Sequence, residues 1–169
     1  MKKITLLAIF SLMMCSIAFA YAKTKAIEFR QVLKEESKSR ETKTYSYSAR
    51  PDGEKKDLIV APEAILSNQD IDQIVIIRKE QNVLKDLPIL DIIFKPVASQ
   101  KLADFTQAHI GEELAVLVDG QLLIAPYLVH PVTKGHYLLS TWKITTNEQA
   151  EQFAKDLGFT PTFKTLKAQ

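Results

Sequence analysis

The sequence predicts an α+β fold, in which a mixed or antiparallel sheet contains a central hairpin and carries two main helices on one face. Two apolar runs, Leu114 to Val118 and Leu122 to Ala125, are separated only by Asp119, Gly120 and Gln121. Asp-Gly between apolar runs is a strong hairpin signal, because both central positions of a type I′ turn need positive φ. Segments with helical spacing precede and follow this hairpin.

The composition is that of a globular protein with an N-terminal export signal. The 169-residue chain is 46% hydrophobic and 25% charged, which allows a buried core, and its length favours one domain. Two early lysines, an apolar stretch to Met14 and small residues around Ala20 and Ala22 are typical of a secretory signal peptide. We therefore predict a cleaved signal over residues 1–22, one domain over 23–169 and a periplasmic location.

Charge and cysteine content narrow the classes of partner. Without Lys2 and Lys3, Lys and Arg fall from 22 to 20 and equal the 20 Asp and Glu, so nucleic-acid binding is not predicted. The only cysteine, Cys15, lies in the signal, so no disulfide is expected. Leu12 to Cys15 also resembles a lipobox, but Met14 stands where a small residue belongs, which makes a lipid anchor at Cys15 the weaker alternative. No later apolar segment approaches about 18 residues, so we expect no integral membrane segment in the mature chain.

The first half of the mature chain is predicted to consist of strands and turns. Alternating or β-branched composition predicts strands at 26–33, 73–79 and 89–95. Ser67 to Asp70 predicts a capped turn, and a further turn is expected at 82–87.

A polar arm interrupts these strands. Residues 34–56 are predicted to form an exposed loop, in which Tyr45 and Tyr47 alternate with serines as a short edge strand. A short apolar run at 57–61 follows, and we expect it to end at Pro62.

Two helices are predicted in the second half. The spacing of Ala98, Leu102 and Phe105 predicts a helix over 98–109, with Gly111 as its C-terminal cap. Thr146 to Gln149 is a capping-box pattern that opens a second helix ending near Gly158. Further strands are expected at 127–129, 137–142 and, as an edge strand, 159–166.

In their order along the chain, these motifs resemble the head of the first periplasmic domain of SecD, a membrane protein that assists bacterial protein export. The resemblance covers residues 26–157, and its most specific element is Leu-Ala-Val-x-x-Asp-Gly followed by Ala-Pro. The matching segments are Ile27 to Arg30, Val60 to Ile71, Leu90 to Phe94, Ala103 to Thr106, Gly111 to Gly120, Ala125-Pro126, Lys134-Gly135, Glu148 to Ala150, Phe153-Ala154 and Leu157. The resemblance implies a head-like fold and contact with unfolded polypeptide.

Several positions depart from the family pattern. Ala98 and Thr141 stand where the family usually has glycine, and Leu102 stands where it has an aromatic residue. SecD continues into transmembrane helices that couple export to the proton gradient, whereas this sequence ends at Gln169 without one. We therefore do not expect the coupling role here.

The residue types that carry chemistry do not predict an active site. His130 and His136 flank the turn at 131–135 and would suit a metal if they met, but no third ligand follows at recognisable spacing. The sequence has no Gly-x-Ser-x-Gly motif and no clustered glycines for a phosphate loop. We predict no catalytic residue, no metal site and no cofactor, and we assign Asp119 and Gly120 to the turn alone.

Aromatic side chains are the candidate binding residues. We select Tyr45, Tyr47, Tyr127 and Tyr137 as exposed positions for contact with extended polypeptide, to which an edge strand would add backbone hydrogen bonds. The alternative is that these rings cover the rim of the core.

The sequence thus predicts a non-catalytic periplasmic module that binds unfolded or translocating polypeptide, or an envelope protein, in relation to protein export. Two alternatives stay open. One is an envelope enzyme with a site near His130 and His136, and the other is a secreted interaction or inhibitor protein that reuses the fold.

Overall fold

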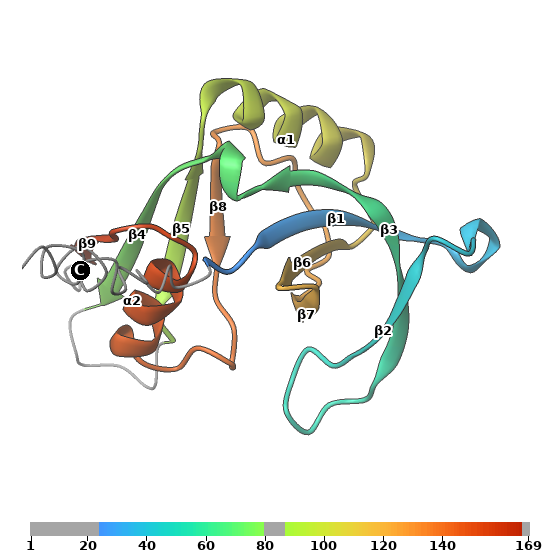
Figure 1. Cartoon of the computed structure of the whole chain (residues 1–169), viewed down its shortest axis with the longest axis horizontal. Coiled ribbons are helices and arrows are strands. Elements are labelled where there is room, and N and C mark those ends of the chain that lie inside the picture. Colours follow the sequence, from blue (N-terminus) through green and yellow to red (C-terminus); the bar gives the residue numbers. More distant parts are fainter. Residues whose placement is uncertain (1–23, 80–86, 167–169) are drawn as a thin grey trace, which may run out of the picture.

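A computed structural model describes residues 24–79 and 87–166 (Figure 1). They form two β-sheets and two α-helices, which confirms the predicted α+β class and divides the expected sheet into two. The predictions for Cys15, Ala20 and Ala22, and all but the last residue of the turn predicted at 82–87, lie outside the described residues.

The first sheet is antiparallel and contains the predicted hairpin. Its strands, in spatial order, are β2 (Lys43–Tyr47), β3 (Lys56–Ser67), β1 (Ile27–Leu33), β6 (Leu114–Val118) and β7 (Gln121–Ile124). Asp119 has φ 48° and Gly120 has φ 72°, the positive values that a type I′ turn requires. The polar arm at 34–56 contains the expected edge strand, β2, and a 3₁₀ turn at Glu35–Ser37.

β3 is longer than predicted, because it runs through Pro62. The expectation that the strand ends there is wrong, since the pairing with β1 changes register at this point: Arg30 pairs with Ala64, and Val32 pairs with Val60. Three residues of β3 therefore lie opposite one residue of β1. Such a bulge tolerates proline, whose missing N–H would otherwise break a ladder bond.

The second sheet has four strands in the spatial order β8 (His136–Leu139), β5 (Ile89–Phe94), β4 (Ile71–Lys79) and β9 (Thr162–Leu166). β9 pairs in parallel with β4 at one edge, which confirms the edge strand expected at the end of the chain. The strand expected at 137–142 is shorter and ends at Leu139. The strand expected at 127–129 is wrong: the segment makes one isolated bridge, between Tyr127 and Glu113.

The two helices are α1 (Pro96–Ala108) and α2 (Asn147–Asp156). In Figure 1, α1 lies across the top of the molecule, and α2 lies beside β4 and β9. The predicted capping box opens α2, because the Thr146 hydroxyl accepts from the Gln149 N–H at 3.2 Å and the Gln149 amide oxygen accepts from the Thr146 N–H at 3.2 Å.

The turn between β3 and β4 is hydrogen-bonded to the start of β1 and to the end of α2. The predicted cap is present, since the Ser67 N–H donates to the Asp70 carboxylate at 2.8 Å. Asn68, inside this turn, makes three side-chain bonds to backbone: it accepts from Ile27 N at 2.6 Å and donates to Lys25 O and Leu157 O, each at 3.0 Å.

The main core lies between the two sheets and receives the buried faces of both helices. A smaller cluster of Val60, Ala115 and Leu117 forms on the opposite face of β3 and β6, where Tyr45 and Leu122 cover it. β6 is therefore buried on both faces, as its unbroken apolar run indicates.

Candidate functional site

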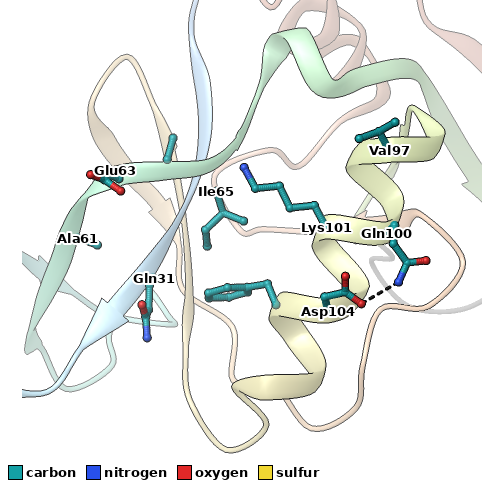
Figure 2. Close-up of a pocket in the computed structure, with 10 residues that line it drawn as sticks. Gln31, Ala61, Glu63, Ile65, Val97, Gln100, Lys101 and Asp104 are labelled. Atoms are coloured by element: carbon teal, nitrogen blue, oxygen red, sulfur yellow. Dashed lines mark hydrogen bonds between the residues drawn. The ribbon is translucent and has the colours of Figure 1, made fainter.

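A groove of about 830 Å³ lies between the bulged part of β3 and helix α1 (Figure 2). The sheet side is lined by Gln31, Ala61, Glu63, Ala64 and Ile65, and the helix side by Val97, Gln100, Lys101, Asp104 and Phe105. The groove therefore combines apolar side chains with three charged side chains.

The helix wall arises from a second stripe of residues on α1. Ala98, Leu102 and Thr106 recur every fourth residue and are buried in the core. Val97, Lys101 and Phe105 each precede one of these by a residue, so they form an adjacent stripe that faces the groove. Val97 is 85% exposed, which is unusual for a large apolar side chain.

The sheet wall arises from the bulge in β3. In Figure 2, the side chains of Ile65 and Lys101 extend into the space between β3 and α1. Phe105 is half-buried and stacks on the His109 ring, with ring centroids 4.1 Å apart and planes at 17°. Ile65 and Phe105, both partly buried and packed against the core, thus supply an apolar floor.

The rim of the groove carries Glu63, Asp104 and Lys101. Asp104 accepts a hydrogen bond from the Gln100 side chain at 2.7 Å. Within the part of the chain that the structure describes, no salt bridge joins any of these three charges to another side chain. With two carboxylates and one ammonium group, the rim favours a neutral or basic ligand over an acidic one.

The four predicted tyrosines do not come together in this groove. Tyr45 is half-buried, and its hydroxyl donates to the Gly120 carbonyl at 3.0 Å. Tyr47 lines a second groove, of about 360 Å³, which also contains Trp142. Tyr127 forms the isolated bridge to Glu113, and its side chain is 61% exposed at the surface.

Tyr137 is a correction to the predicted set. Its side chain is only 6% exposed, so the expectation of an exposed aromatic there is wrong. The ring packs edge-on against Phe29, with centroids 5.2 Å apart, because β8 places alternate side chains into the core. Burial raises the pKa of the Tyr137 hydroxyl, which has no hydrogen-bond partner among the described residues.

The histidines do not form a shared site. His136 Nδ1 lies 3.0 Å from both carboxylate oxygens of Asp91, and this pair is at the surface. His130 is exposed, and His109 Nδ1 lies 2.7 Å from the carbonyl of Phe105. Over residues 24–79 and 87–166, no group of three or more His, Cys, Asp or Glu side chains is placed to hold a metal ion.

Sequence reasoning missed the groove residues Ile65 and Val97, and it assigned Phe105 to the buried face of its helix. One signal was available: Val97 is a large apolar residue that lies off the stripe formed by Ala98, Leu102 and Phe105. The other wall was not predictable, because it depends on β3 continuing past Pro62.

The fold is that of the SecDF proteins. A solved SecDF, described as a membrane component that enhances protein export, superposes with a TM-score of 0.54 at 19% identity over 79% of this chain and 62% of that chain. A second solved SecDF, in a super-membrane-facing form, gives a TM-score of 0.56 at 18% identity, covering 80% of this chain and 19% of that chain. At these identities the likeness shows the fold.

The family follows from the sequence comparison. The family model for the SecDF P1 head subdomain matches residues 42–158, and the chain belongs to this family. The protein translocase subunit SecD of Thermobaculum terrenum is 31% identical over 67 residues, and that of Acidaminococcus fermentans is 35% identical over 49 residues. These matches cover 40% and 29% of this chain, and 12% of each relative's length.

Membership of this family relates the chain to protein export, because SecDF is a component of that process. Among the described helices, neither α1 nor α2 has the length and apolar character needed to cross a membrane.

Proposed function

We propose that this protein is a non-catalytic periplasmic module, with one head-like domain over 23–169, that binds unfolded polypeptide during export in the groove between β3 and α1. The observation that carries the proposal is the groove itself, with an apolar floor of Ile65 and Phe105 and the exposed Val97 at one end. Membership of the SecDF P1 head family supports a role in export.

The chemistry of the groove suits an unfolded chain. An unfolded segment presents apolar side chains that a folded protein would bury, and the groove offers apolar surface at Ile65, Val97 and Phe105. The charged side chains of Glu63, Lys101 and Asp104 stay in water at the rim, so the apolar contact with the bound chain is confined to the floor between them. Tyr47 and Tyr127 lie outside this groove, and we propose them as further contact residues for a longer chain.

The test is binding of a permanently unfolded probe, such as a reduced and carboxamidomethylated model protein, measured by fluorescence anisotropy with the purified protein. We expect saturable binding that Val97→Asp weakens by about tenfold or more, because a charge replaces an apolar contact. Val97 is the second residue of α1, where an acidic side chain is compatible with the helix dipole, so the variant is expected to fold.

Val129→Asp is the matched control. Val129 is also an exposed valine, at 62%, but it does not line the groove. Equal losses in both variants would place the contact elsewhere. Absence of binding to the unfolded probe would refute the proposed function.

A further inference from the structure

One edge of β3 has no strand partner where it borders the groove. β2 pairs with β3 only from Lys56 to Val60, although β3 continues to Ser67. β1 occupies the opposite edge, with Arg30 paired to Ala64 and Phe29 paired to Leu66. On the β2 side, no described strand pairs with residues 61–66 of β3.

The backbone of this segment carries hydrogen-bonding groups that are only partly used. Arg30 Nη1 donates to the Ala61 carbonyl at 3.1 Å and also to the Pro62 carbonyl. Glu63 and Ala64 are exposed, and no further hydrogen bond across the β2 side of residues 61–66 is found among the described residues. Backbone N–H and C=O groups of a strand edge are matched best by another extended backbone, at about 4.8 Å spacing.

The groove places this edge beside a helix wall. Ala61, Glu63, Ala64 and Ile65 of β3 line one side, and Val97 with its stripe on α1 lines the other. A peptide added to the edge would lie in line with β2, which already occupies the same side of β3. Its alternate side chains would then face the apolar floor, since successive side chains of a strand point to opposite faces.

We propose that the groove binds polypeptide as an added β-strand, antiparallel to β3 and in line with β2, with its backbone hydrogen-bonded to the edge formed by residues 61–66. This inference rests on the proposed function and specifies its mode of recognition. The occupant is an extended segment with alternating apolar residues and a neutral or basic flank, which complements Glu63 and Asp104 at the rim.

This mode makes recognition depend on the backbone more than on the side chains. Backbone bonds are available from nearly every residue of an extended chain and supply most of the affinity, while the apolar floor and the charged rim set the preference for particular side chains. A helix laid in the same groove would use the backbone groups of its interior internally and would leave the β3 edge without partners.

The test uses one extended peptide of alternating apolar residues with a lysine at one end, and two derivatives of it. One derivative carries N-methyl groups on the odd-numbered amides, and the other carries them on the even-numbered amides. Only one set of amides can face β3, so one derivative should lose about tenfold or more in affinity and the other should bind within about threefold of the parent. Amide exchange at residues 61–66, where Pro62 has no N–H, should slow when the parent peptide binds.

The outcomes separate the two proposals. If the parent peptide and the unfolded probe both fail to bind, the proposed function fails. If the parent binds but both derivatives bind alike, whether strongly or weakly, and residues 61–66 gain no exchange protection, strand addition is overturned while polypeptide binding stands. A peptide with glutamate in place of the terminal lysine should bind more weakly, and equal binding would overturn the charge preference at the rim.

Discussion

Asp119 and Ala26 are joined by two hydrogen bonds. The Ala26 N–H donates to Asp119 Oδ1 at 2.9 Å, and the Asp119 N–H donates to the Ala26 carbonyl at 2.8 Å. The hairpin turn therefore also holds the residue that precedes β1, which is the central strand of its sheet. The carboxylate has a second role in addition to its place in the turn.

Asp119→Ala is expected to lower the free energy of unfolding by about 1–2 kcal/mol, because alanine loses the bond to Ala26 and fits a positive φ less well. Asp119→Asn keeps an oxygen acceptor and tolerates this backbone conformation, so it should cost less than half as much. Urea unfolding at neutral pH measures both. Equal losses would mean that the hydrogen bond to Ala26 contributes nothing.

Asn68→Ala is expected to destabilise the fold by about 2–3 kcal/mol, since it removes three bonds to backbone groups at the start of β1 and the end of α2. Gln69→Ala is the matched control, because Gln69 is the next residue, is exposed, and makes no side-chain hydrogen bond to the described residues. Thermal and urea unfolding should separate the two variants. Similar stabilities would contradict this role for Asn68.

Tyr137→Phe is expected to raise the free energy of unfolding by about 1 kcal/mol. The ring contact with Phe29 is kept, and a buried hydroxyl without a partner among the described residues is removed. Tyr127→Phe should leave stability unchanged, because Tyr127 is 61% exposed. A destabilised Tyr137→Phe protein would show that the hydroxyl forms a hydrogen bond in solution.

The Lys25–Asp156 pair is expected to make stability depend on pH at the acid end. The Lys25 ammonium, 2.5 Å from Asp156 and assisted by Gln152, lowers the pKa of this carboxyl below its ordinary value of 3.8. A carboxyl whose folded-state pKa is lowered stabilises the fold above its unfolded-state pKa, and this contribution is lost as the pH falls through the folded-state pKa. Asp156→Asn should therefore flatten the loss of stability below pH 3.8. An unchanged slope in acid unfolding would contradict this linkage.

The same pair acts in the opposite sense at the alkaline end. The hydrogen bond to Asp156 raises the pKa of Lys25 above 10.5. The stabilisation of the fold by the Lys25 ammonium is therefore fully present below pH 10.5 and is lost as the pH rises through the folded-state pKa of Lys25. Both side chains are partly exposed, so added salt should reduce both effects, which unfolding at two ionic strengths would measure.

Features that depend on a few neighbouring residues were predictable from the sequence. The Asp119-Gly120 turn, the Ser67 cap and the Thr146 capping box each satisfy local backbone geometry, and all three are present. These signals are short and physically specific, which explains why they identify the hairpin, the turn before β4 and the start of α2.

Features that depend on distant segments were not predictable. Tyr127 and Tyr137 both lie in stretches that mix polar and apolar residues, yet one is exposed and the other is buried because only Tyr137 points between the two sheets. The division into two sheets and the passage of β3 through Pro62 likewise depend on register with β1. The groove depends on both, so it had no local signal on its sheet side.

The two sheets alternate along the chain. β1 to β3 belong to the first sheet, β4 and β5 to the second, β6 and β7 to the first again, and β8 and β9 to the second. No single cut in the chain would leave both sheets complete, and β1 cannot form both its ladders until β6 is available. Chains dominated by such distant pairings fold slowly, on the scale of about milliseconds to seconds. This order of assembly delays folding until most of the chain has emerged, a delay that suits a protein we propose to cross a membrane unfolded.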